Sequence, residues 1–508
     1  MSQPAFFSSR AIRNAMLVFL FVTAFAIRLY DLTDLPLDFH PTRQLLSAIK
    51  ARALYFETQP DGVSTEKLET GIRQAKLKAQ VEPVIFEQLV AYTYQFTGEQ
   101  LWVARVYSSL FWIVGGLFLF LLVRDLLSFE AAIFSTAYYL FFPYAIIASR
   151  SFQPDPLMVM LIIAFWWIFS RWITLTLSPS PTGRGMRGAL LAGLLGGFAI
   201  FIKFSAAFFV IGAALGLGLS RFTMRDLLRN TQVWVMATLG ALPALIYLVY
   251  GVFIEGGLGG QFSGRFIPSL LLNPLNYLLW MTKVDLATGG IFVMLALLGF
   301  FFTQDRRLRS LMFGLWGAYL FYSLFFDYHV ATHDYYHLPL IPIVAVSLGP
   351  LGGWFFARLA ESTVQRYQRS VVYVILILGM FMMVWHVRNQ MKAVDYRPDA
   401  AMWAQIGELV HDERVVALTQ DYGSRLEYWG WQIVNTWPSI GEMSHSQLRG
   451  GKIDSFDAMF DDYTGKRDLF LVTDFDEFKA QTQLRERLST YNIYAEDEGY
   501  VIYDLRKP

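Results

Sequence analysis

Apolar windows recur along the first 390 or so residues of the chain, separated by short polar segments. Each window is about 17–25 residues long, the length that a helix needs to cross a hydrocarbon core of about 30 Å. The first window is too long for a cleaved signal peptide and lacks a small-residue cleavage site, so we expect a retained helix. The pattern predicts about eleven transmembrane helices, over residues 12–30, 101–123, 129–148, 156–176, 188–202, 204–220, 232–254, 288–303, 309–327, 337–358 and 370–388.

Positive residues gather in alternate loops between these windows. Because cytoplasmic loops are enriched in Lys and Arg, this pattern predicts a cytoplasmic N-terminus in an inner or plasma membrane. The loops 31–100 and 255–287, and everything after about residue 390, then lie on the extracytoplasmic side. The basic residues on the predicted cytoplasmic side include Arg10, Arg13, Arg124, Arg187, Arg221, Arg225, Arg306, Arg307 and Arg358.

The long polar segments have periodicities of their own. In the first external loop, 42–57 and 83–97 carry apolar residues at helical spacing, which predicts amphipathic helices along the membrane surface. The C-terminal part alternates helical stretches with β-rich runs, which predicts a small α/β domain outside the membrane. These runs are 415–418, 469–472 and 500–503. We therefore expect a polytopic α-helical membrane domain over 1–390, including the loop 31–100, and an extracytoplasmic α/β domain over 391–508.

Composition supports the membrane class and narrows the chemistry. The chain is 55% hydrophobic and only 16% charged, and its net charge of +1 gives no indication of a nucleic-acid partner. The absence of cysteine excludes disulfides, thiolate nucleophiles and cysteine metal sites. Carboxylates and histidines must therefore carry any acid–base chemistry.

The segment LDFHPTRQ at 37–44 lies just outside the first window. It places Asp38, His40 and Arg43 within six residues. A carboxylate, an imidazole and a guanidinium at a membrane surface can bind a phosphate and activate a hydroxyl. Asp38 as a cap of the following helix is the structural alternative.

Further polar residues lie at the ends of apolar windows. Asp155 stands between two prolines, as a cavity carboxylate or as a helix cap. Lys203 interrupts an apolar stretch, where it would face an anion or extend to the interface. HDYYHLPLIP at 333–342 combines two histidines with two tyrosines, which are also common at interfaces. Arg150 and Arg265 could bind the same anion or be solvated loop charges.

The order of these features resembles the C-type (GT-C) glycosyltransferases, membrane enzymes that use polyprenyl-phosphate sugars and include protein O-mannosyltransferases and aminoarabinose transferases. The resemblance covers nearly the whole membrane region. It rests on Arg28, the acidic and His-Pro segment at 38–41, Glu82-Pro83, Gly98 with Arg105, the 150–155 segment, Lys203 in GFAIFIKF, and HDYYHLPLIP.

The resemblance implies transfer of a sugar from a polyprenyl-phosphate donor to a hydroxyl of a glycan, lipid or protein acceptor, with inversion. In this interpretation Asp38 and Asp155 are catalytic. An alternative register aligns His40-Pro41 with the family's His-Pro-Asp-Glu motif, which leaves Thr42 and Arg43 at the acidic positions. The donor phosphate would meet Arg43, Lys203, Arg265, His333, Tyr336 and His337. Site-lining candidates are His40, Glu82, Arg150 and Tyr335. The use of a divalent cation is left open, with Asp38, Asp155 and Glu82 as its candidate ligands.

Two alternatives remain at this point. A transporter or flippase of a lipid-linked sugar would also be polytopic, but we find no paired halves. An oligosaccharide ligase with a polyprenyl-pyrophosphate donor shares the architecture, but the 255–287 loop holds only Arg265 and Lys283 as basic residues. No P-loop is found.

Overall fold

The structure is a computed structural model that describes residues 6–7, 9–59, 62–79, 82–175, 184–254, 256, 258–259, 265–361, 366–451 and 455–506. The chain divides into two compact units. The helical unit comprises residues 1–32, 80–85 and 102–393, and the α/β unit comprises 33–79, 86–101 and 394–508. The helices of the first external loop thus group with the C-terminal residues.

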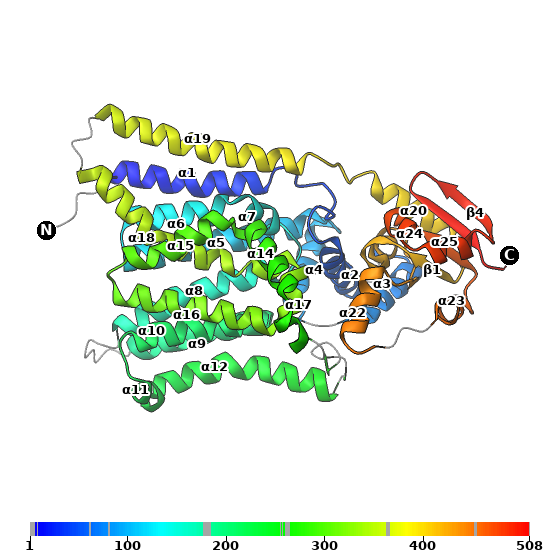
Figure 1. Cartoon of the computed structure of the whole chain (residues 1–508), viewed down its shortest axis with the longest axis horizontal. Helices are drawn as coiled ribbons and strands as arrows, with labels where there is room; N and C mark the ends of the chain where they lie inside the picture. The colour runs from blue at the N-terminus through cyan, green and yellow to red at the C-terminus, as the bar shows by residue number, and fades with distance from the viewer. Residues whose placement is uncertain are drawn as a thin grey trace. The chain divides into compact units, whose positions relative to one another are not determined.

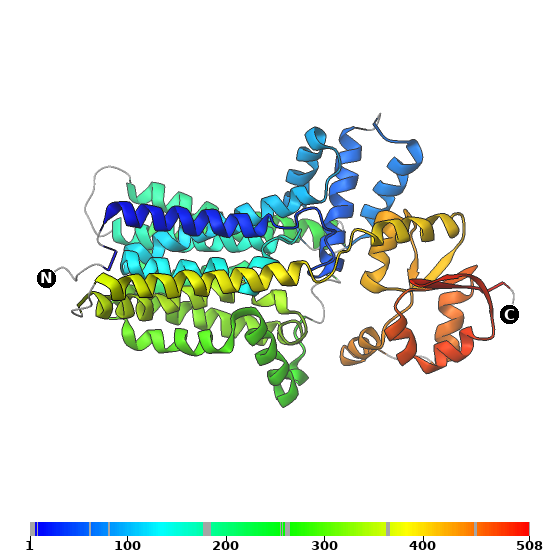
Figure 2. The ribbon, with the colours of Figure 1, turned by 90° about the horizontal axis from the view of Figure 1, so that it is seen from above.

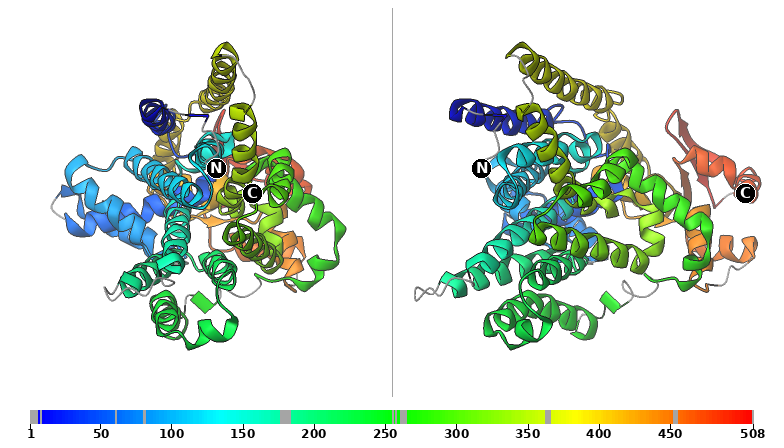
Figure 3. Two further views of the ribbon diagram at one scale, coloured as in Figure 1. Left: turned by 90° about the vertical axis from the view of Figure 1, so that its left-hand side faces the viewer. Right: turned by 60° about the vertical axis from the view of Figure 1, so that its left-hand side comes forward.

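The helical unit is a bundle of long helices, many of them seen end-on in Figure 3 (left). Its first half, coloured blue to green in Figure 1, consists of α1 (Arg10–Arg28), α5 (Trp102–Leu126), α6 (Phe129–Phe141), α7 (Pro143–Ala148), α8 (Asp155–Leu175), α9 (Arg184–Ile202), α10 (Ala206–Leu219), α11 (Met224–Arg229), α12 (Thr231–Val249) and the π-helix η2 (Tyr250–Ile254). Its second half consists of η3 (Pro268–Leu272), α14 (Pro274–Thr288), α15 (Gly290–Phe302), α16 (Arg306–Phe325), α17 (Asp327–Thr332), η4 (Asp334–His337), α18 (Leu340–Glu361) and α19 (Arg366–Met391).

Among the described residues, 7 helices are long and apolar enough to cross a membrane, or up to 8 if one bent pair counts as a single span. This confirms the predicted class of a polytopic helical membrane protein, with fewer full-length spans than the eleven windows. The difference arises at four windows. One of them is α16, an unbroken helix of 20 residues that is not among the 7, and the other three contain breaks or short helices. Pro143 separates α6 from α7, α10 has only 14 residues, and α14 and α15 meet at 86°.

Glycines allow the closest helix contacts in this unit. A Cβ on Gly314 of α16 would lie 2.2 Å from the carbonyl oxygen of Gly212 on α10, and a Cβ on Gly216 would lie 2.4 Å from the carbonyl oxygen of Ser310. The two backbones therefore touch without side chains between them, the small-residue packing that is common between helices in membranes.

The α/β unit contains three helices from the first external loop, and a β-sheet with its flanking helices from the C-terminal part. The loop helices are α2 (Pro41–Thr58), α3 (Thr65–Leu77) and α4 (Ile85–Thr97), of which the sequence predicted α2 and α4. The C-terminal elements are α20 (Asp399–Leu409), β1 (Val415–Leu418), η5 (Gln420–Gly423), α21 (Ser424–Trp429), β2 (Asn435–Thr436), α22 (Ile440–Leu448), α23 (Phe456–Thr464), β3 (Leu469–Val472), α24 (Phe475–Ala480), α25 (Thr482–Leu488), β4 (Asn492–Asp497) and β5 (Tyr500–Asp504).

The sheet has the strand order β2-β1-β3-β5-β4. β1 pairs in parallel with β2 and β3, whereas β5 is antiparallel to both β3 and β4. The three β-rich runs of the sequence form its three central strands. Each residue of β1 and β3 is buried, because helices cover both faces of the sheet (Figure 2).

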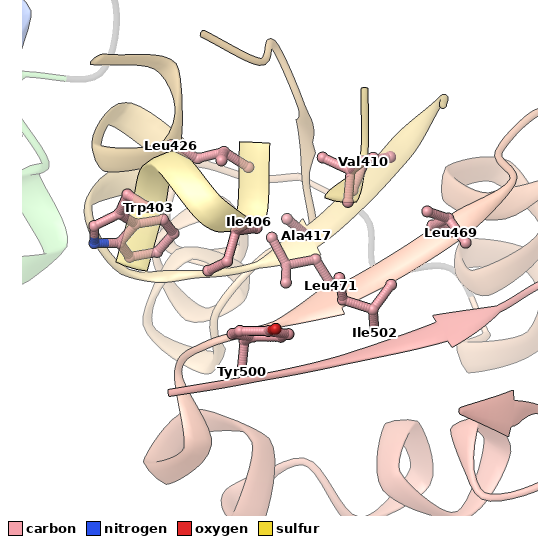
Figure 4. Close-up of a cluster of buried hydrophobic side chains, with 10 residues drawn as sticks. Trp403, Ile406, Val410, Ala417, Leu426, Leu469, Leu471, Tyr500 and Ile502 are labelled. Carbon is pink, nitrogen blue, oxygen red and sulfur yellow. The ribbon is translucent and has the colours of Figure 1, made fainter. Parts of the chain in front are cut away.

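Alternate residues of these strands face two separate cores. Val415 and Ala417 of β1 pack with Trp403 and Ile406 of α20 and with Leu426 on one face, the cluster drawn in Figure 4. On the other face Val416, Leu418 and Phe470 pack with Phe460, Leu484 and Leu488. The period of two explains why short apolar runs without polar alternation become central strands.

A buried arginine joins α2 to the C-terminal elements. Arg52 Nε donates to Glu99 Oε1 at 2.8 Å, and its Nη1 donates to the carbonyl oxygen of Tyr428 at 2.7 Å. Its guanidinium also lies 3.6 Å from the ring centre of Tyr428. Because Arg52 is only 4% exposed, this network fixes α2 against the start of the C-terminal part.

Candidate functional site

A buried ion pair forms the centre of the candidate site in the helical unit. Asp155 is the first residue of α8, and Lys203 lies in the break between α9 and α10. Lys203 Nζ and Asp155 Oδ1 are 2.8 Å apart, and the two side chains are 12% and 2% exposed. The sequence left open whether Asp155 caps its helix. In the structure Asp155 Oδ1 accepts a hydrogen bond from Lys203 Nζ, and Oδ2 accepts none from a backbone N–H of α8.

Two tyrosines of η4 surround the ammonium group of this pair. Lys203 Nζ lies 5.3 Å from the ring centre of Tyr335 and 5.4 Å from that of Tyr336. Arg265 Nη1 is 3.4 Å from Tyr336 Oη. The predicted residues Lys203, Arg265, Tyr335 and Tyr336 are therefore gathered in one place, where two cations and a phenol can meet one anion.

Arg265 has structural support from the residues that follow it. The buried carboxylate of Asp327 accepts hydrogen bonds from the backbone N–H of Ile267 at 3.3 Å to both oxygens. Tyr336 is fixed through its carbonyl oxygen, which accepts from Tyr322 Oη at 3.1 Å. The Arg265 segment and Tyr336 are thus each held by a buried polar side chain.

The site also contains buried polar atoms that have no partner within the described part of the chain. Asp155 Oδ2 is one. The others are both amide atoms of Gln153, a residue with 0% exposure that lies two positions before Asp155 in the sequence. A buried amide or carboxylate without a hydrogen bond costs about 1–3 kcal/mol. Such groups call for an explanation, and a bound ligand with hydroxyl groups supplies one.

The two histidines of the HDYYH motif differ in their environment. His337 is fully buried, its Nε2 donates to the carbonyl oxygen of Val330 at 2.9 Å, and its Nδ1 accepts from Tyr319 Oη at 2.8 Å. Both ring nitrogens are used within the protein, so His337 supports η4. His333 is half-buried, and its Nδ1 lies 2.7 Å from Thr332 Oγ1.

Two further predicted residues belong to this unit, Arg150 and Glu82. Arg150 is buried, and its Nη2 donates to the carbonyl oxygens of Tyr30 at 2.8 Å and Asp31 at 3.0 Å, which fixes the chain after α1. Glu82 is half-buried in the short 80–85 segment of the unit. Among the described residues, no group of three His, Asp or Glu side chains is arranged to hold a metal ion.

The remaining candidates belong to the α/β unit. His40 precedes α2 with a left-handed backbone (φ 45°), and its carbonyl oxygen accepts from the N–H of Arg43 at 3.0 Å. Asp38 Oδ1 lies 3.4 Å from Gln44 Nε2, whose closer partner is the Phe39 carbonyl oxygen at 2.6 Å. Asp38, His40 and Arg43 are all half-buried, so each is accessible to a ligand.

Comparison with known proteins agrees with this architecture. Residues 81–250 match the family described as dolichyl-phosphate-mannose-protein mannosyltransferase. ArnT from Cupriavidus metallidurans in the apo state is similar in structure, with a TM-score of 0.56, 15% identity, and coverage of 96% of this chain and 98% of that one. The same enzyme bound to undecaprenyl phosphate gives a TM-score of 0.54 with 16% identity over 96% and 97% of the two chains.

The oligosaccharyltransferase AglB from Archaeoglobus fulgidus, in complex with an inhibitory peptide and a dolichol-phosphate, gives a TM-score of 0.53 with 12% identity. That match covers 97% of this chain and 74% of AglB. The chain has the GT-C fold. No curated protein sequence gives a significant match.

Within this GT-C fold, sequence reasoning missed residues that support the site. Gln153 lies two residues before Asp155, in the polar run 149–155 that the sequence reasoning used only for Arg150 and Asp155. Tyr144 of α7 interacts electrostatically with the carboxylates of Asp155 and Asp334, and Asp327 supports the Arg265 segment. Neither had a recognisable motif, because their partners lie far away in the sequence.

Proposed function

We propose that this protein transfers a sugar from a polyprenyl-phosphate-linked donor to an acceptor hydroxyl on the extracytoplasmic side of the membrane. The observation that carries the proposal is the cluster of Lys203, Arg265 and Tyr336 beside the partly unpaired carboxylate of Asp155. The similarity to ArnT bound to undecaprenyl phosphate and to AglB with a dolichol-phosphate supports a lipid-phosphate donor.

In this mechanism the lipid phosphate is the leaving group. Attack on the anomeric carbon breaks its bond to the phosphate oxygen, and negative charge grows on the phosphate. Lys203 and Arg265 would stabilise that charge, and Tyr336 Oη would donate a hydrogen bond to it. Charges fixed in a buried site act strongly, because they need no reorganisation when the reaction occurs.

Asp155 has two roles in the proposal. Its Oδ1 holds Lys203 in place, and its unpaired Oδ2 accepts a hydrogen bond from a sugar hydroxyl of the donor. The buried amide of Gln153 would contact the same sugar. These contacts orient the anomeric carbon before the acceptor arrives, which lowers the entropic part of the barrier.

Asp38 is proposed to deprotonate or orient the acceptor hydroxyl, with His40 and Arg43 beside it. A single displacement then inverts the anomeric centre. The hexose or pentose transferred, the acceptor and the use of a divalent cation are open to experiment. The proposed topology has a cytoplasmic N-terminus, as the distribution of Lys and Arg predicts.

The test is transfer of radiolabelled sugar from a panel of polyprenyl-phosphate sugars in membranes that contain the wild type or a variant. Lys203→Ala and Asp38→Asn should each lower transfer by about 100- to 1,000-fold, the usual effect of removing one stabilising or proton-transferring group. Lys392→Ala is the matched control, because Lys392 is exposed after α19 and should retain wild-type activity.

Four outcomes would separate the alternatives. Full activity of Asp38→Asn would remove this carboxylate as the base, and full activity of Lys203→Ala would remove the proposed phosphate site. Loss of activity with a chelator, restored by a divalent cation, would establish metal dependence. Movement of the intact lipid-linked sugar across the membrane without transfer would favour a flippase.

A further inference from the structure

The α/β unit contains a large open cleft that has no part in the proposed transfer chemistry. Its volume is about 910 Å³, within the range of about 300–1,000 Å³ that is usual for ligand pockets. All of its lining residues belong to the α/β unit. We call it the tryptophan cleft, because it is lined by α3, by residues 404–414, and by the segment Trp429–Asn435 with two indole rings.

The backbone of the cleft wall is held in an uncommon conformation. Trp431 has φ 59°, in the left-handed region that bulky residues rarely adopt, at a cost of about 1–3 kcal/mol. The preceding Gly430 packs directly on α20, where a Cβ on Gly407 would lie 2.2 Å from the Gly430 carbonyl oxygen. Tight packing therefore fixes the segment that presents Trp429 and Trp431 to the cleft.

The ring of Trp431 is braced by neighbours. It stacks on Phe56 at a centroid distance of 6.2 Å and an interplanar angle of 8°, and the Arg52 guanidinium lies 4.3 Å from its centre. Trp431 and Trp429 are both half-buried, so each still presents some surface. A strained, braced and partly exposed indole is suited to contact a ligand.

The charges of the cleft argue for an uncharged ligand. Four Lys and Arg side chains line it, Lys67, Arg73, Arg414 and Arg467, against four carboxylates, Glu66, Glu408, Asp412 and Glu413. His411 also lines the cleft, 3.5 Å from Glu66 and 3.0 Å from Asp412. Several of these charges are already paired, since Arg414 binds Asp468 at 2.8 Å and Glu413 binds Arg506 at 3.1 Å. The lining is therefore nearly neutral and rich in hydrogen-bonding groups, unlike a phosphate or nucleic-acid site.

We propose that the tryptophan cleft binds a neutral saccharide chain, as a site separate from the transfer centre. Sugar rings have an apolar C–H face that packs on indole and hydroxyl edges that bond to carboxylates, guanidinium groups and amides. The exposed parts of Trp429 and Trp431 supply the apolar surface, and Arg73, Gln432 and Asn435 supply the polar partners. That this saccharide is part of the acceptor rests on the proposed function; saccharide binding itself does not.

The test is binding of neutral oligosaccharides to the purified full-length protein in lipid nanodiscs. Maltohexaose, chitotetraose and mannotetraose serve as probes, with titration calorimetry and saturation-transfer NMR as readouts. Thr70→Trp fills the cleft without removing a packed side chain, and Trp431→Ala removes one face. Both should weaken binding by at least about tenfold, the effect of losing about 1.4 kcal/mol. Tyr494→Ala is the control, an aromatic residue of β4 that is 44% exposed outside the cleft.

The proposal fails if none of the probes binds the wild type, if binding persists in Thr70→Trp, or if Tyr494→Ala loses it equally. Binding of inorganic pyrophosphate with the same dependence on Thr70→Trp, in place of saccharide, would also overturn it. Lys203→Ala separates the two proposals. It should bind the saccharide as the wild type does, whether or not it transfers sugar.

Discussion

The ion pair between Asp155 and Lys203 gives the sharpest test of the candidate site. Replacing Asp155 by Asn leaves the ammonium of Lys203 buried without its counter-charge. Removing one partner of a buried pair usually costs 3–5 kcal/mol. Because Lys203 also faces the rings of Tyr335 and Tyr336 and is 12% exposed, we expect the low end, about 3 kcal/mol.

The double variant Asp155→Asn/Lys203→Met removes both charges together. It should recover most of the lost stability, since replacing a buried pair by neutral side chains is often neutral or favourable. The double-mutant cycle should therefore give a coupling energy of about 3 kcal/mol, far above the few tenths of a kcal/mol seen for distant residues. Unfolding in mixed detergent micelles, followed by tryptophan fluorescence, measures all four proteins.

Activity should behave differently from stability in the same cycle. If Lys203 stabilises the departing phosphate, the double variant is well folded and still inactive. Transfer that returns with stability would refute the catalytic assignment and leave a structural ion pair. A coupling energy below about 0.5 kcal/mol would refute the pair as an energetic unit.

Three further predictions follow from single contacts. Gly314→Ala should destabilise the helical unit by about 1–3 kcal/mol through overpacking against α10. Gly317→Ala is the control and should change stability by less than about 1 kcal/mol, because a Cβ there meets nothing within 4 Å. Thermal unfolding of the two variants compares them. Gln153→Met should keep or raise stability by about 1–3 kcal/mol while lowering transfer, and a clear loss of stability would mean that its amide has partners in the folded protein. Hydrogen bonds from Arg414 lower the pKa of Asp468 to about 2, so the stabilisation by the Asp468 carboxylate is present above about pH 4 and is lost as the pH falls toward 2. The difference in melting temperature between the wild type and Arg414→Gln should therefore narrow from pH 7 to pH 3. An unchanged difference would contradict the ion pair.

Much of the fold follows from hydrophobic pattern alone. The central strands β1, β3 and β5 were predicted because short apolar runs must be buried on both faces. β4 was missed, since most of its residues are exposed and its sequence NIYAED has no apolar alternation. α3 was missed for a related reason, because only Gly71 and Gln74 of its residues are buried.

The candidate site could be predicted only as a set of residue types. A charge in an apolar window indicates a partner, but no local rule says that Lys203 meets Asp155, which lies 48 residues earlier. Likewise, the environment of each predicted residue could not be read from its motif. The motif predicted that His337 meets the donor phosphate. In the structure its two ring nitrogens bond to Tyr319 and to the carbonyl oxygen of Val330.

Helix ends explain why charged groups are tolerated in the apolar unit. Lys203 lies where α9 stops, yet its N–H still bonds to the carbonyl oxygen of Ala199 at 3.1 Å, and its own carbonyl oxygen accepts from Ala206 at 2.9 Å. The break therefore leaves no backbone group of Lys203 without a partner, a lack that a membrane interior would penalise.

Asp155 is the first residue of α8, where the helix dipole favours a carboxylate. Both charges thus occupy positions that the backbone already accommodates. The cost that remains is desolvation, and each partner lowers it for the other. In the proposed mechanism, a phosphate at Lys203 would add a second counter-charge to the same ammonium while the pair with Asp155 stays in place.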